Sequence, residues 1–124
     1  MRNRLVTRTE WFRFFDEFSR RHEGWLVTVR VLSPGFGSQV EARDLPLEGI
    51  VSAADGSGPI SIHVGGTAER NLEHEVREPR QVWVELSESG VEQALGIISE
   101  DQTRTIVEFR APELPENVDG ILRA

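Results

Sequence analysis

Short runs of alternating apolar and polar residues follow one another from Trp25 to Phe109. Alternation with a period of two is typical of strands, because successive side chains then point to opposite faces. Turn-forming sequences such as Asp55-Gly56-Ser57-Gly58 separate the runs. The pattern therefore predicts a meander of about eight short antiparallel strands, near residues 25–32, 39–44, 47–53, 60–64, 71–77, 82–86, 92–99 and 104–110.

An amphipathic helix over about residues 8–22 precedes these strands. Its apolar side chains recur at i, i+3, i+4 and i+7 and form one stripe: Trp11, Phe14, Phe15 and Phe18. Thr7 and Glu10 have the spacing of a capping box at the start of the helix. Burying four such aromatic side chains favours folding by roughly 6–12 kcal/mol before entropy is counted, so the helix must pack on the sheet.

The predicted fold class is α+β, with the N-terminal helix packed on the antiparallel meander. The meander is expected to form a strongly curved sheet or a small barrel. A chain of 124 residues is expected to form one domain, residues 1–124, with a C-terminal tail over residues 111–124. Pro46 interrupts one of the alternating runs, and we expect a bend or a short edge there.

Apolar residues occupy both faces of much of the predicted sheet. The runs near 60–64 and 71–77 have a polar outward face, whereas the other runs place apolar residues there: Leu26, Ile50, Trp83, Ala94, Ile98 and Ile106. A sheet that is apolar on both faces is normally covered on both. We expect the helix to lie against the strands that carry Trp83, Ile98 and Ile106. If it packs elsewhere, these residues and Leu26 become a candidate homodimer surface.

Composition narrows the range of partners. The formal net charge is −7, and an acidic surface repels both nucleic acids and anionic membranes. Cysteine is absent, which excludes disulfides and thiol catalysis. The sequence has no apolar run long enough to span a bilayer. We therefore expect a soluble cytoplasmic protein whose partner is itself or another protein, with no nucleic acid and no membrane.

The chain shows no catalytic motif, and its candidate ligand residues are few. His63 and His74 fall on opposite faces of adjacent strands, so neither a metal nor another cofactor is expected. His74 lies on an apolar face, where it is either a hydrogen-bonded core histidine or a pH-sensitive buried group. Charged side chains cluster around Pro46, either as a solvated, ion-paired surface or as an acid/base pair: Glu41, Arg43, Asp44 and Glu48.

Two segments carry a resemblance to a known family. They are residues 22–29 (HEGWLVTV) and 39–50 (QVEARDLPLEGI), and the helix with Trp11 and the closing segments 114–116 (LPE) and 118–120 (VDG) also fit. The chain resembles a family of small bacterial proteins grouped as domain of unknown function 5335. The resemblance implies a stand-alone bacterial domain and brings no known activity, ligand or catalytic residue.

Three functional hypotheses follow. The preferred one is a non-enzymatic protein-interaction module that forms a homo-oligomer, because apolar residues populate both sheet faces and no catalytic constellation is present. The first alternative is a β-barrel that binds a small ligand, with His74 and the polar bend at residues 41–48 as the residues of interest. The second alternative is a hydrolase that uses the carboxylates near Pro46.

Overall fold

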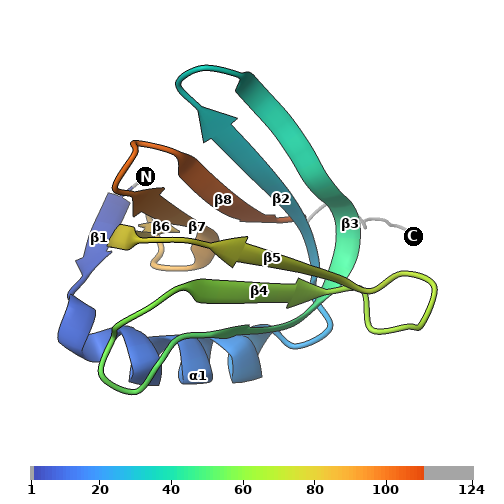
Figure 1. Ribbon diagram of the computed structural model, residues 1–124. Helices are drawn as coiled ribbons and strands as arrows, with labels where there is room; N and C mark the ends of the chain where they lie inside the picture. Colours follow the sequence, from blue (N-terminus) through green and yellow to red (C-terminus); the bar gives the residue numbers. More distant parts are fainter. Residues whose placement is uncertain (1, 111–124) are drawn as a thin grey trace.

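The structure, a computed structural model, describes residues 2–110, and the tail expected over residues 111–124 lies outside this range. One helix and a preceding 3-10 turn accompany eight strands in a single antiparallel sheet of order β1-β6-β7-β8-β2-β3-β4-β5 (Figure 1). In chain order the elements are β1 (Arg2–Val6), η1 (Arg8–Glu10), α1 (Trp11–His22), β2 (Leu26–Ser33), β3 (Gly37–Val51), β4 (Ile60–Val64), β5 (Leu72–Val76), β6 (Pro79–Leu86), β7 (Glu92–Ser99) and β8 (Arg104–Phe109).

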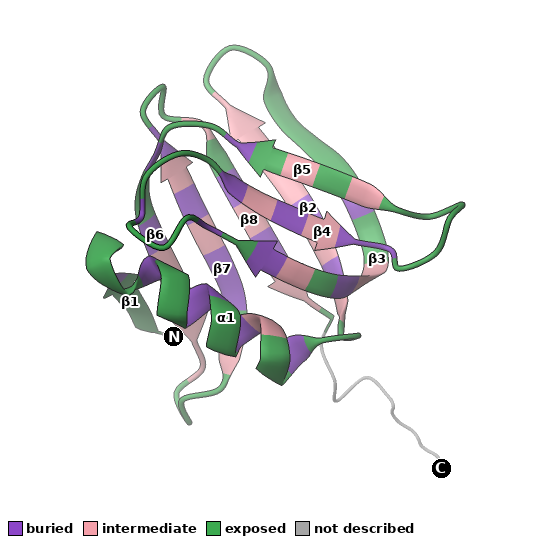
Figure 2. Ribbon diagram, turned by 60° about the horizontal axis from the view of Figure 1, so that its bottom comes forward, coloured by how far each residue is buried: buried purple, intermediate pink, exposed green. Residues whose placement is uncertain are grey.

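The sheet is open and somewhat curled. Strands β2 to β5 and strands β6 to β8 form two meanders that are joined where β8 pairs with β2. The half that carries β4 and β5 turns to face the half that carries β6, β7 and β8 (Figures 1 and 2). Strands β1 and β5 remain as the two edges. The predicted α+β class is confirmed, and the structure shows the curved sheet rather than the barrel.

The core lies inside this curl. Both halves of the sheet contribute alternate residues that are fully buried, among them Ile62 of β4, Val84 of β6 and Leu95 of β7. Figure 2 shows buried and less buried bands alternating along β6 and β7, as a period of two requires. The predicted helical stripe is buried in the same core: Trp11, Phe14, Phe15 and Phe18.

Helix α1 packs on the concave side of the sheet and not against the face that carries Trp83, so the expected position was wrong. Phe18 stacks on Phe109 of β8 with ring centroids 5.6 Å apart. Ser19 Oγ accepts a 2.9 Å hydrogen bond from the Ile50 N–H. Ile50, expected on the outward face, is therefore buried beneath the helix. The stripe goes to the concave side because curvature surrounds it there with apolar residues from both halves of the sheet.

The two strands expected at 39–44 and 47–53 form one long strand, β3. Its first part pairs with β2 and its last part with β4, and both pairings contain register shifts typical of bulges. Asp44 has a φ of 51°, which bends the strand before Pro46. A bulged strand tolerates a proline because the ladder is already interrupted. The shift also turns Val40 to the exposed side while Ala42 is buried.

The N-terminal segment differs from expectation in two respects. Residues 2–6 form an edge strand, β1, which pairs with β6. Arg4 shares its inner side with Val6 and lies over the Phe14 ring, 5.7 Å from its centroid. The expected capping box is absent: Thr7 caps the 3-10 turn without a side-chain hydrogen bond. Instead, Trp11 Nε1 donates a 2.9 Å hydrogen bond to the Val6 carbonyl and fixes the start of α1.

Candidate functional site

The most distinctive surface is the outward side of five neighbouring strands, β1, β6, β7, β8 and β2, called here the outer face. Residues directly opposite one another in an antiparallel pair share a face, so the registers of these strands define rows across the sheet. The central row is Leu5, Trp83, Gly96, Ile106 and Arg30. The acidic row on one side is Asn3, Glu85, Ala94, Glu108 and Thr28. The Arg104 row on the other side is Gln81, Ile98, Arg104 and Leu32.

A shallow groove of about 420 Å³ lies on the outer face, with Trp83, Ile98 and Ile106 among the residues that line it. Trp83 Nε1 donates a 3.2 Å hydrogen bond to Gln81 Oε1, so the indole is held toward its own strand neighbour. The neighbouring Gly96 is left uncovered, since a Cβ built there would meet no atom within 4 Å. The floor of the groove is thus an open backbone position between a tryptophan and an isoleucine.

The charges of the outer face are segregated by row. Glu85 and Glu108 stand in the acidic row, and Arg104 stands on the opposite side of the central row. Arg30 and Glu108 pair within the chain, with Nε and Oε1 2.8 Å apart. Glu85 and Arg104 have no ion-pair partner among residues 2–110. The outer face therefore offers one carboxylate and one guanidinium group for contacts with a second molecule.

The structure brings together three of the four residues predicted for an interface. Trp83, Ile98 and Ile106 line the same groove. Leu26 has the same outward orientation but lies beyond Thr28, next to the end of β8, and is not part of the groove lining. Leu5, Glu85, Gly96 and Arg104 belong to the surface and were not predicted, since their positions depend on strand pairing rather than on local pattern.

The structure places the predicted ligand residues on two strands, β3 and β5. His74 is partly buried on the inner side of β5, opposite Ile62. The four charged residues of β3 are exposed: Glu41, Arg43, Asp44 and Glu48. Outside the strand ladders, the only hydrogen bond from this group among residues 2–110 is donated by the Asp44 backbone N–H to Thr28 Oγ1, at 3.3 Å. His63 and His74 lie on opposite faces, as predicted.

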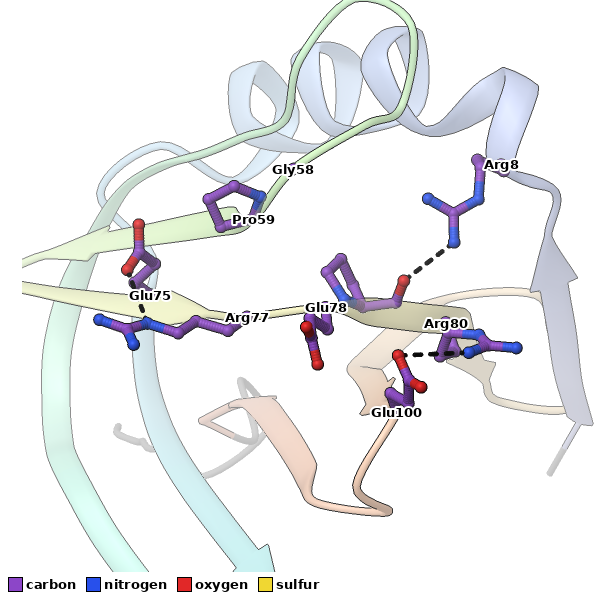
Figure 3. A pocket seen from close by; sticks show the side chains of 9 residues that line it. Arg8, Gly58, Pro59, Glu75, Arg77, Glu78, Arg80 and Glu100 are labelled. Carbon is purple, nitrogen blue, oxygen red and sulfur yellow. Dashed lines mark hydrogen bonds and ion pairs between the residues drawn. The ribbon is translucent and has the colours of Figure 1, made fainter.

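A cavity of about 750 Å³ forms an open depression beside the β5–β6 corner (Figure 3). Figure 3 shows Arg77 and Arg80 pointing in opposite directions, each beside a carboxylate, Glu75 and Glu100. Arg8 at its margin donates to the carbonyls of Gly56 (2.7 Å) and Pro79 (2.9 Å). Each guanidinium group is already engaged, so the depression is better explained as a structural corner than as an anion site.

A buried histidine closes the C-terminal end of α1. His22 lies among the rings of Phe18, Trp25 and Phe109, with centroids 4.4–4.7 Å from its own. Its Nδ1 lies 2.8 Å from the Phe18 carbonyl, which makes Nδ1 the donor and Nε2 the titrating nitrogen. Burial lowers the pKa of His22, and the hydrogen bond to the Phe18 carbonyl and the nearby carboxylate of Glu92 oppose this effect only in part. His22 is thus a neutral core residue in a packed aromatic cluster.

Two further observations bear on the class of protein. Within residues 2–110, no group of three or more histidine, aspartate or glutamate side chains is placed to hold a metal ion. The one helix described there is too short and too polar to cross a membrane.

The fold and the outer face define a small α+β protein built on an open, curled antiparallel sheet. Residues 2–118 match the model of a family of unknown function, DUF5335, and the chain belongs to that family. The resemblance seen in the sequence is thereby confirmed. No curated protein and no solved structure matched the chain.

Proposed function

We propose that this protein is a non-enzymatic interaction module that forms a homodimer through its outer face. The observation that supports the proposal most strongly is the groove in which Trp83 and Ile106 flank the uncovered Gly96. Tryptophan and arginine are enriched at the energetic centres of protein interfaces, and Trp83 and Arg30 both stand in the central row of the outer face.

A second copy of the chain fits this face better than a partner of a single charge. The outer face carries two carboxylates, Glu85 and Glu108, and two guanidinium groups, Arg30 and Arg104. These charges sum to zero although the whole chain carries −7. Two outer faces can therefore approach without the repulsion that the remaining surface would produce.

Sedimentation equilibrium over a wide concentration range tests the proposal. We expect the wild-type chain to dimerise reversibly and the Gly96→Arg variant to be a folded monomer. The added side chain has open space in the monomer, since a Cβ at Gly96 meets nothing within 4 Å, but it occupies the groove. Circular dichroism and thermal unfolding would verify that this variant folds.

Gly35→Arg is the matched control. A Cβ at Gly35 also meets nothing within 4 Å, and this residue lies in the β2–β3 loop, away from the groove. This variant should dimerise as the wild type does. A wild-type chain that stays monomeric at every concentration, or a Gly96→Arg variant that still dimerises, would overturn the proposal and leave the groove to another occupant.

A further inference from the structure

Strand β5 presents a free edge at one end of the sheet. Its five residues pair in regular register with β4, and β5 is the last strand in the sheet order. In an antiparallel edge strand, every second residue directs its N–H and C=O groups away from the ladder. Among residues 2–110, β5 makes no backbone–backbone hydrogen bond beyond this ladder. Unpaired backbone groups of this kind can accept an added strand from another chain.

The two edges of the sheet differ in how open they are to such addition. At the other edge, Arg4 points to the inner side of β1 and lies over the Phe14 ring, and an inward charge on an edge strand hinders further pairing. The inner side of β5 instead carries Leu72, His74 and Val76, and Leu72 packs against the core. Figure 2 shows exposed and intermediate bands along β5. Apolar residues of an added strand would therefore extend the inner side of the sheet.

The outward side of β5 is acidic. Glu73 and Glu75 are exposed there and lie opposite His63 and Ser61 of β4. Glu75 Oε1 lies 3.3 Å from Arg77 Nε, whereas Glu73 has no ion-pair partner among residues 2–110. Opposite charges that face each other across a strand pair stabilise it, and like charges destabilise it. Two β5 strands paired antiparallel about their centres would bring Glu73 opposite Glu75, so this edge favours a basic strand over a second copy of itself.

We propose that the edge of β5 binds an extended segment of a partner protein in which basic and apolar residues alternate. Two basic side chains lie opposite Glu73 and Glu75 on the outward side, and the apolar residues lie beside Leu72 and His74 on the inner side. Main-chain hydrogen bonds of the added strand supply affinity, and its alternate side chains supply selectivity. Strands β3 and β4 separate β5 from the outer face, so this interaction is independent of the proposed dimer.

NMR titration of the isotope-labelled protein with short capped peptides tests the proposal. The probe is the peptide Val-Arg-Val-Arg-Val, and the control peptide Arg-Arg-Val-Val-Val has the same composition and charge without the alternation. We expect the alternating peptide to shift the backbone amide signals of β5 and to leave those of Trp83 and its neighbours on the outer face unchanged. It should bind about tenfold more tightly than the control peptide, because only the alternating order places both arginines on the acidic side.

Protein variants locate the binding site. Glu73→Arg should weaken binding of the alternating peptide by about tenfold, since an attraction across the strand pair becomes a repulsion. Glu88→Arg, the same charge change at an exposed residue of the β6–β7 turn, is the matched control and should bind the peptide as the wild type does. Gly96→Arg should also bind it normally, which keeps a failure here distinct from a failure of the dimer.

Three results would overturn the proposal. The first is the absence of binding at millimolar peptide, and the second is equal binding of the two peptides or equal losses in Glu73→Arg and Glu88→Arg. The third is the formation of wild-type oligomers that Glu73→Arg dissociates, since a second copy of the chain would then occupy the edge.

Discussion

The substitution Phe18→Ala tests the packing of helix α1 on the concave side of the sheet. The Phe18 side chain is fully buried, and its ring contacts Phe14, His22 and Phe109 at centroid distances of 5.4, 4.5 and 5.6 Å. Removing a buried phenylalanine ring costs about 3–5 kcal/mol through lost burial and the cavity left behind. Phe18 contacts rings from both α1 and β8. The helix and the sheet cannot both move inward to fill the cavity that the substitution leaves. We therefore expect Phe18→Ala to lower the free energy of unfolding by about 4 kcal/mol.

Phe12→Ala provides the matched control on the same helix. Phe12 is 49% exposed, and we expect its replacement to change the free energy of unfolding by no more than about 0.5 kcal/mol. Urea denaturation at one protein concentration would measure both variants. If Phe18→Ala were no more destabilising than Phe12→Ala, the helix would not be packed as described and the account of the core would be refuted.

Three further predictions test separate parts of the structure. Arg8→Lys should lower the free energy of unfolding by about 1–3 kcal/mol, because lysine cannot donate to the Gly56 and Pro79 carbonyls from one planar group. The control is Arg20→Lys, in an exposed pair with Asp16, which should lower it by less than about 0.5 kcal/mol in the same urea assay. Burial lowers the pKa of His22, whose ring faces Glu92 and Arg21, so its neutral form is favoured on folding. The wild type should therefore lose stability relative to His22→Phe as the pH falls below about 6.5, and the loss should be complete below the pKa of His22 in the folded state. Parallel curves of unfolding free energy against pH for the two proteins would contradict this. Gly96→Thr, measured at a concentration where the chain is monomeric, should raise the free energy of unfolding by about 0.5–1 kcal/mol, since the strand loses a glycine and the new Cβ meets no atom. A lower free energy of unfolding would contradict the open space described above Gly96.

Periodicity predicted most of the elements, because most strands bury one face. The runs at 60–64 and 92–99 correspond to β4 and β7, and the aromatic stripe of α1 is buried as its spacing indicates. Strand β1 escaped detection since Arg4, a charged residue, shares the inner side with Val6 and interrupts the apolar alternation.

The long strand β3 was divided in the prediction for a different reason. Pro46 lacks the N–H that a regular ladder uses, and local pattern cannot show that bulges on either side accommodate it. The Pro46 carbonyl still accepts a 2.8 Å hydrogen bond from the Gly65 N–H, so the strand continues through the proline.

The candidate site was predicted in its apolar part only. Alternation placed Trp83, Ile98 and Ile106 on one face, and strand pairing brings them into one groove. The relation between Glu85 and Arg104 depends on the register of three strands, which no local pattern contains. The side of the sheet that receives the helix was also undetermined, because apolar residues occur on both faces and only curvature distinguishes them.

The most direct test of the outer-face dimer is cross-linking at its centre. The chain has no cysteine, so Gly96→Cys introduces a single reactive thiol without a clash. Facing sheets lie about 10 Å apart, too far for a direct disulfide, and a short bismaleimide is the suitable probe. Ser61→Cys, on the outward side of β4, is the control. The account predicts rapid formation of a covalent dimer by Gly96→Cys and only slow, collisional coupling by Ser61→Cys; equal rates for the two variants, or faster coupling at Ser61, would contradict it.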